Sequence, residues 1–148
     1  MKLGTFATAP ISNDIGLGVM TQWIFPGSNA ASILLRISGS LAFLALFWHA
    51  MRNLKDWEAA TAGILLIPIL TNPTNYYFSF FAIAALMAHH RPRVGLILLA
   101  TALLWNINGL VLYQKHSEFY WASVIAVVSC FALVFELAGK PQESEAAS

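Results

Sequence analysis

The sequence has very few charged residues for its length. Asp, Glu, Lys and Arg together make up 10% of the 148 residues, against about 25% in a typical soluble protein. Eight basic and seven acidic residues leave a formal net charge of +1, which gives no positive field for a nucleic acid. So few charges cannot cover a soluble globule of this size. The composition therefore excludes a soluble domain and a nucleic-acid partner, and it predicts a membrane protein.

Groups that bind metals or carry out catalysis are also scarce. Cys130 is the only cysteine and lies in an apolar run, which excludes an internal disulfide and a zinc or redox pair. The sequence has no HExxH, P-loop, GxSxG or CxxC motif. Paired histidines such as His89 and His90 can hold a haem, but histidine is common at membrane interfaces. We therefore predict no metal site and no cofactor.

The apolar residues, 58% of the sequence, form long runs. A spanning helix needs about 20 of them, and this length is reached at residues 31–50, 94–113 and 119–138. Residues 58–71, which contain Pro68, and residues 76–90 are shorter. The sequence predicts an all-α, polytopic transmembrane helical bundle of about five spans, or four if residues 58–90 are re-entrant.

The N-terminal part is different in character. Residues 1–10 lack the apolar stretch of a secretory signal peptide, so we expect insertion to depend on a later segment. Residues 15–25 are apolar but too short to span, which predicts an interfacial or partly re-entrant segment. We divide the chain into an extracytoplasmic or interfacial segment (1–30), a transmembrane bundle (31–138) and a short cytoplasmic tail (139–148).

The basic residues predict an orientation. With five spans, one side carries five of them and the other side three. The first group is Arg52, Lys55, Arg91, Arg93 and Lys140, and the second is Lys2, Lys115 and a snorkelling Arg36. Cytoplasmic loops carry the excess of Lys and Arg. We therefore expect a multi-pass protein of the inner (plasma) membrane with an extracytoplasmic N-terminus and a cytoplasmic C-terminus.

The same topology gathers the unusual polar residues on the outer face. These candidate site residues are Asp14, Arg36, Asn72, Asn75, Asn106, Asn108, Lys115 and His116. Polar groups at membrane depth are costly, and they line cavities or pair across helices. A water-accessible outer site would account for all of them together, although the sequence assigns none of them a catalytic role.

Each candidate also has a simpler interpretation. Asn106 and Asn108 point about 200° apart on a helix, so they cannot face one point, and at least one is expected to bond helix to helix. Arg36 can mark the interface. The TNPTN segment (71–75) can be a turn, and Lys115 and His116 can be a solvated pair.

Two stretches resemble a known group of proteins. ISNDIGL (11–17) and LIPILTNPTNYYFSFFAIAALMAHHRPRVG (66–95) resemble the C-terminal region of large bacterial polytopic membrane proteins, which group loosely with HTTM-like proteins or with lipid-linked glycosyltransferases of the GT-C class. SEFYWAS (117–123) resembles them more faintly. The resemblance implies an incomplete chain. It carries no catalytic residue over, because the acidic motifs of GT-C enzymes would lie upstream.

Three functions follow as hypotheses. The first is a structural helical bundle of a larger membrane protein, with the lipid bilayer, other membrane subunits or a missing N-terminal half as partners. The second is part of a membrane enzyme acting on a lipid-linked substrate at the outer face, with Asp14 as the only nearby carboxylate. The third is a small transporter or accessory subunit with Asn106 or Asn108 lining a path.

Overall fold

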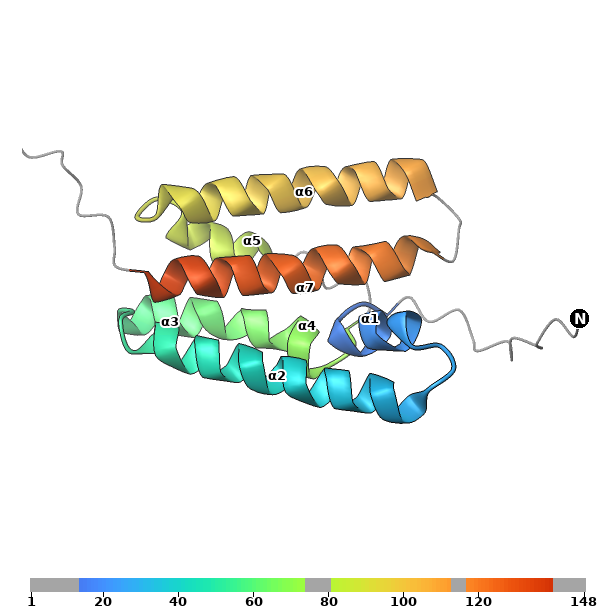
Figure 1. The fold of residues 1–148 in the computed structure, drawn as a ribbon. Coiled ribbons are helices and arrows are strands. Elements are labelled where there is room, and N and C mark those ends of the chain that lie inside the picture. The colour runs from blue at the N-terminus through green and yellow to red at the C-terminus, as the bar shows by residue number, and fades with distance from the viewer. Residues whose placement is uncertain (1–13, 74–80, 113–116, 140–148) are drawn as a thin grey trace, which may run out of the picture.

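The computed structural model describes residues 14–73, 81–112 and 117–139, and within them the chain is helical (Figure 1). The elements in chain order are α1 (Leu17–Ile24), α2 (Asn29–Met51), α3 (Asp56–Ala62), the 3₁₀ turn η1 (Gly63–Leu66), α4 (Ile67–Leu70), α5 (Phe81–Ala84), the 3₁₀ turn η3 (Ala85–Met87), α6 (Pro92–Leu112) and α7 (Ser117–Ala138).

Three of the described helices are long and apolar enough to cross a membrane. They are α2, α6 and residues Glu118–Ala138 of α7, with mean hydropathies of 1.9, 1.9 and 2.1. α7 lies in the middle of the bundle and packs against α6, α2 and α1 (Figure 1). The predicted spans at residues 31–50, 94–113 and 119–138 correspond to these three helices, and their ends agree within two residues.

The predicted span at residues 58–71 is a shorter, broken helix. α3, η1 and α4 follow one another with seven, four and four residues. Pro68 has no N–H to give to the Ile64 carbonyl, and the Ile67 N–H bonds that carbonyl instead, with 3₁₀ spacing. At 1.5–2.0 Å per residue this run rises about 25 Å, less than the roughly 30 Å of hydrocarbon.

The chain turns back after α4 and returns through short pieces. Thr71 is extended, and Asn72 precedes Pro73, a position that disfavours helix. Of the predicted span at residues 76–90, the structure describes α5 and η3, with four and three residues. The described residues therefore hold three helices of spanning length, and neither of the predicted short spans is among them.

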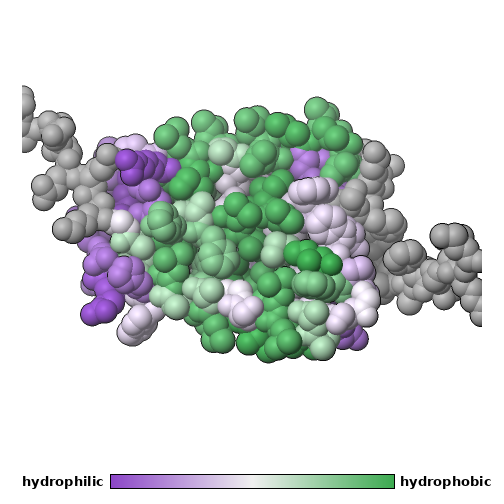
Figure 2. Space-filling view, viewed as in Figure 1, coloured by the Kyte–Doolittle hydropathy of each residue, from purple (hydrophilic) through white to green (hydrophobic). Residues whose placement is uncertain are grey.

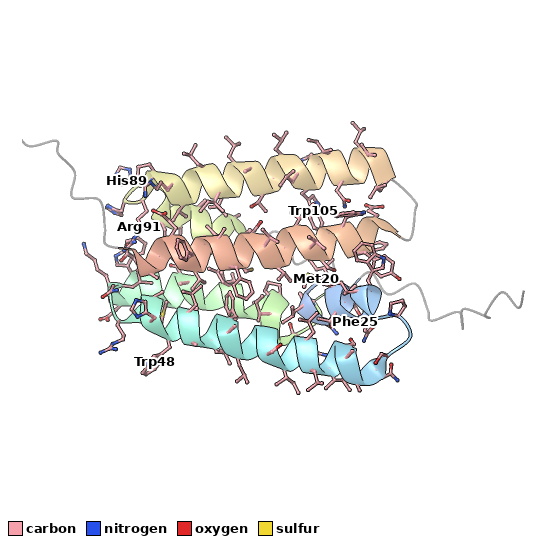
Figure 3. The ribbon with its side chains drawn as sticks, viewed as in Figure 1. Met20, Phe25, Trp48, His89, Arg91 and Trp105 are labelled. Carbon is pink, nitrogen blue, oxygen red and sulfur yellow. The ribbon has the colours of Figure 1, made fainter. Side chains whose placement is uncertain are left out.

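The bundle has two ends, which we name after residues labelled in Figure 3. The Arg91 end holds the end of α2, the start of α3, the turn from η3 to α6 and the end of α7. The Phe25 end holds the connection from α1 to α2, the end of α6 and the start of α7.

α1 descends into the bundle instead of lying flat on its surface. Its first residue, Leu17, faces Gly39, where an added Cβ would be 3.2 Å from the Leu17 side chain. Further along, the Ser32 hydroxyl donates to the Thr21 hydroxyl (3.3 Å). α1 therefore runs antiparallel to the first half of α2, and it begins about 15 Å along that helix. The interfacial or partly re-entrant position predicted for residues 15–25 stays a prediction.

The core is apolar and lies around α7. Its largest fully buried side chains come from several helices: Phe43, Leu65, Ile69, Met87, Leu133 and Leu137. Phe43 meets Phe131 edge to face, with ring centroids 5.0 Å apart. On α7, the small residues Ala122, Ala126 and Cys130 recur every fourth position and are buried, so neighbouring chain segments can approach closely.

The visible surface of the bundle is apolar between its ends (Figure 2). Large hydrophobic side chains of α2 and α6 are exposed along both helices. Hydrophilic residues gather at the Arg91 end. This is the distribution expected when lipid surrounds the middle of the bundle and water its ends.

Candidate functional site

The start of α1 meets the end of α4 inside the bundle. The Ile15 N–H donates to the Pro73 carbonyl (2.8 Å), which joins the two segments. Gly16, the residue before α1, has φ +130°. A Cβ there would lie 2.5 Å from the Pro68 carbonyl oxygen and 3.0 Å from that of Thr71. Only glycine fits this crossing, because its backbone conformation and the space available both exclude a side chain. We call it the α1–α4 junction.

α7 holds the α1–α4 junction in place. The Gly16 N–H donates to the Ser123 hydroxyl (3.1 Å), and the same hydroxyl donates to the Phe119 carbonyl (2.8 Å). Ser123 is fully buried. Beside it, Ile15 packs against Ala122, Ala126 and the partly buried Trp105. A buried N–H at a helix start would be costly without a partner, and Ser123 supplies one.

Two of the predicted site residues belong to segments that the α1–α4 junction brings together. Asn72 lies against the first turn of α1, where a Cβ on Gly18 would be 2.5 Å from the Asn72 side-chain oxygen. Asp14 is half-buried and directly precedes the Ile15–Pro73 bond. The junction thus brings the Asn72 amide beside the carbonyl groups that end α4, with Asp14 next to it in the chain. These are oxygen donors suited to a cation, a proton or hydroxyl groups of a substrate.

The two asparagines of α6 lie on different sides of that helix, as their spacing predicts. Asn108 is buried, and its amide donates to the Glu118 carbonyl of α7 (3.0 Å). This confirms the helix-to-helix interpretation for one of the pair. Asn106 is exposed and donates to the Ala102 carbonyl of its own helix (2.7 Å). Neither side chain contributes to the α1–α4 junction.

The other candidates do not complete a site. Arg36 is half-buried on α2, seven residues after the first residue of that helix, and no ion pair or hydrogen bond links its side chain to another described residue. Asn75, Lys115 and His116 lie outside the described residues. The described part of the chain contains no group of three His, Cys, Asp or Glu side chains that could hold a metal ion.

Aromatic rings gather at the Phe25 end. Trp23 of α1 stacks on Tyr120 with ring centroids 5.7 Å apart, and it lies 5.6 Å from Trp121. Both partners belong to the first turns of α7. Such a cluster is typical of an aromatic belt at one membrane interface.

A buried ion pair at the Arg91 end is not apparent from the sequence. Glu58 and Arg91 lie 3.4 Å apart (Oε1 to Nε), and their side chains are only 7% and 4% exposed. Arg91 also donates to the Gly139 carbonyl (3.4 Å), while Glu58 accepts the N–H of Lys55 (3.1 Å). The pair links α3, the start of α6 and the end of α7. Its signal in the sequence is two opposite charges that border an apolar stretch.

A second polar contact joins α6 to α7 near the middle of both helices. The hydroxyl groups of Thr101 and Ser129 lie 2.7 Å apart, and the Thr101 hydroxyl also donates to the Ile97 carbonyl (2.7 Å). Both residues are buried. The contact fixes the register of the two helices, because sliding either one would leave a hydroxyl without a partner in an apolar layer.

Comparison with known proteins gives no relative from which a role could be transferred. No protein-family model matches the chain, and neither a curated protein nor a solved structure matches it.

Proposed function

We propose that this protein is an integral membrane protein of three spans whose role is structural, as a helical bundle within an inner-membrane assembly. The apolar outer surface of α2 and α6 carries the proposal. Only 11% of the most apolar stretch of α2 and 17% of that of α6 are buried inside the bundle. Exposing such apolar surfaces to water would be unfavourable for a protein of this size, whereas contact with lipid or with a neighbouring membrane helix is favourable.

The polar groups inside the bundle support a structural role. Ser123, the Thr101–Ser129 pair and Asn108 all bond to protein atoms. Buried polar groups that bond across helices fix one packing arrangement. This favours a rigid bundle over one organised around an open polar path along α6 and α7.

The charges support one orientation of the three spans. Arg52, Lys55, Arg91 and Arg93 all lie at the Arg91 end, and of the described basic residues only Arg36 lies elsewhere. The positive-inside rule then favours a cytoplasmic Arg91 end. In a Cys130→Ala background, an impermeant maleimide added to intact cells should label Ser28→Cys at the Phe25 end and spare Asn53→Cys. The reverse labelling would contradict this orientation.

The structural role is tested by Ala126→Leu and Asp14→Asn, two substitutions near the α1–α4 junction. Ala126 is fully buried beside Ile15, so Ala126→Leu should overpack the bundle, at a cost of about 1–3 kcal/mol. Ala45 is exposed on α2, and Ala45→Leu is the matched control. We expect Ala126→Leu, unlike Ala45→Leu, to lower the unfolding temperature in detergent and the protein level in the membrane. Asp14→Asn cells that keep the normal protein level should grow normally.

A second candidate is a contribution to an enzyme that acts on a lipid-linked substrate at the outer face. The position of Asp14 and Asn72 beside a break in the helices favours it, because broken helices inside membrane bundles often form binding sites. The resemblance to GT-C glycosyltransferases agrees with this reading. If Asp14→Asn cells kept the normal protein level but accumulated lipid-linked precursors, measured by mass spectrometry of lipid extracts, this candidate would replace the structural one.

A further inference from the structure

One face of α6 carries a regular stripe that no described part of the chain covers. Its members alternate at spacings of three and four residues: Leu96, Leu99, Leu103, Asn106 and Leu110. The four leucines are 60–84% exposed, and Figure 3 shows side chains projecting from α6 away from the other helices. Alternation of three and four is the spacing by which one helix packs along another with a small crossing angle.

Asn106 is the unusual member of this stripe. Its amide donates to the Ala102 carbonyl, which leaves the side-chain oxygen and the second N–H without a partner among the described residues. It lies six residues before the last residue of α6, or roughly 9 Å along the axis. Because α6 is about as long as the hydrocarbon layer is thick, this depth places an exposed amide inside the hydrocarbon, where an unpaired polar group costs free energy.

We propose that the stripe on α6 binds the same stripe of a second copy of this chain. The inference depends on the membrane insertion contained in the proposed function. Two copies inserted in the same orientation are related by a twofold axis along the membrane normal, so Asn106 of each copy lies at the same depth. An amide is both donor and acceptor, and therefore an identical amide satisfies both of its free positions. The leucines on either side would pack against their counterparts.

The outer face of α2 shows why the polar residue decides the partner. It carries a stripe at the same spacing, formed by Leu34, Ile37, Leu41, Leu44 and Trp48, which are 38–72% exposed. From Leu34 to Leu44 this stripe has only Leu and Ile side chains, which lipid chains satisfy fully, and its one polar atom is the indole N–H of Trp48 in the last turn of α2. Apolar residues alone give little drive for association in a membrane, whereas a polar residue does. α2 is thus a matched control within the same molecule.

Disulfide cross-linking tests the geometry. In a Cys130→Ala background, Leu103→Cys and Leu110→Cys on α6 are compared with Leu41→Cys on α2, and isolated membranes are oxidised with copper phenanthroline. The two α6 variants should form a cross-linked species of twice the monomer mass, because a disulfide needs Cβ atoms about 3.5–4.5 Å apart, and the α2 variant should not. Equal cross-linking on both helices, no cross-linking on α6, or a product of another mass would overturn the proposal.

Energy transfer between labelled copies in lipid vesicles tests the role of the amide. We expect Asn106→Val to raise the dimer dissociation constant about three- to twentyfold, the range that one polar contact gives between membrane helices, and Asn106→Gln to raise it less. An unchanged constant for Asn106→Val would refute the pairing. Alkaline carbonate separates the two proposals, since release of the unmodified protein refutes membrane insertion, while retention without cross-linking refutes the dimer alone.

Discussion

Gly16→Ala adds only one methyl group, but it should strongly destabilise the protein. Gly16 has φ +130° and ψ −173°, a region that only glycine adopts readily. The added Cβ would be 2.5 Å from the Pro68 oxygen and 3.0 Å from the Thr71 oxygen, both of which are backbone atoms. Backbone cannot move aside as a flexible side chain can, so α1 or the end of α4 must shift.

The expected magnitude follows from the two effects together. The strained backbone conformation costs about 1–3 kcal/mol, and overpacking costs a further 1–3 kcal/mol or so. A shift of α1 would also lengthen the 3.1 Å bond from Gly16 to Ser123. We expect a loss of roughly 3–4 kcal/mol in unfolding free energy, which corresponds to about 10 °C in unfolding temperature for a chain of this length.

Thermal unfolding in detergent, followed by circular dichroism, measures this loss. Gly63→Ala is the matched control, because Gly63 has helical dihedral angles (φ −52°, ψ −27°) and no atom within 4 Å of an added Cβ. Alanine is favoured over glycine in a helix by about 1 kcal/mol, so the control should be neutral or slightly stabilised. If the two variants unfolded at the same temperature, the close approach at the α1–α4 junction would be refuted.

Two further predictions concern contacts between helices. Arg91→Met leaves the Glu58 carboxylate buried without its counterion and should lower the unfolding free energy by about 3–5 kcal/mol. Arg93→Met removes an exposed pair and should lower it by less than about 1 kcal/mol. Equal losses for the two variants in chemical unfolding would contradict the burial of the Glu58–Arg91 pair. Asn108→Ala removes the bond to the α7 backbone and should lower the unfolding free energy by roughly 1–2 kcal/mol; no change in the same assay would show that this bond does not hold α6 to α7.

The long helices could be predicted from the sequence because their signal is local. A run of about 20 apolar residues needs no knowledge of its neighbours to be read as a span. The break at residues 58–71 was visible for the same reason, through Pro68 and the short length of the run. The place within the bundle where this run ends could not be predicted, because it is set by a contact between residues far apart in the chain. The Ile15 N–H and the Pro73 carbonyl define that place, and neither has a distinctive sequence environment.

The grouping of the candidate residues could be predicted in part. Sorting polar residues by topology placed Asp14 and Asn72 in one group, and the structure brings their segments together. The same sorting also included Asn108, whose partner is the backbone of α7. Topology gives the depth of a residue but not the direction in which its side chain points. The Glu58–Arg91 pair was missed because each residue alone looks like an ordinary interfacial charge, and only the fold shows that both are buried.

The meeting of two helix ends, those of α4 and α1, has a cost in free energy that one continuous helix would avoid. Each helix end exposes backbone groups without helical partners, here within an apolar bundle. The chain compensates them one by one: Thr71 bonds back to Ile67, Pro73 accepts the N–H of Ile15, and Ser123 accepts that of Gly16. The negative end of α4 also adjoins the positive start of α1, which is favourable. A continuous helix would need neither this glycine nor this serine. The α1–α4 junction, to which the segments of Asp14 and Asn72 belong, is therefore the part of the described bundle in which a role beyond packing should be sought first.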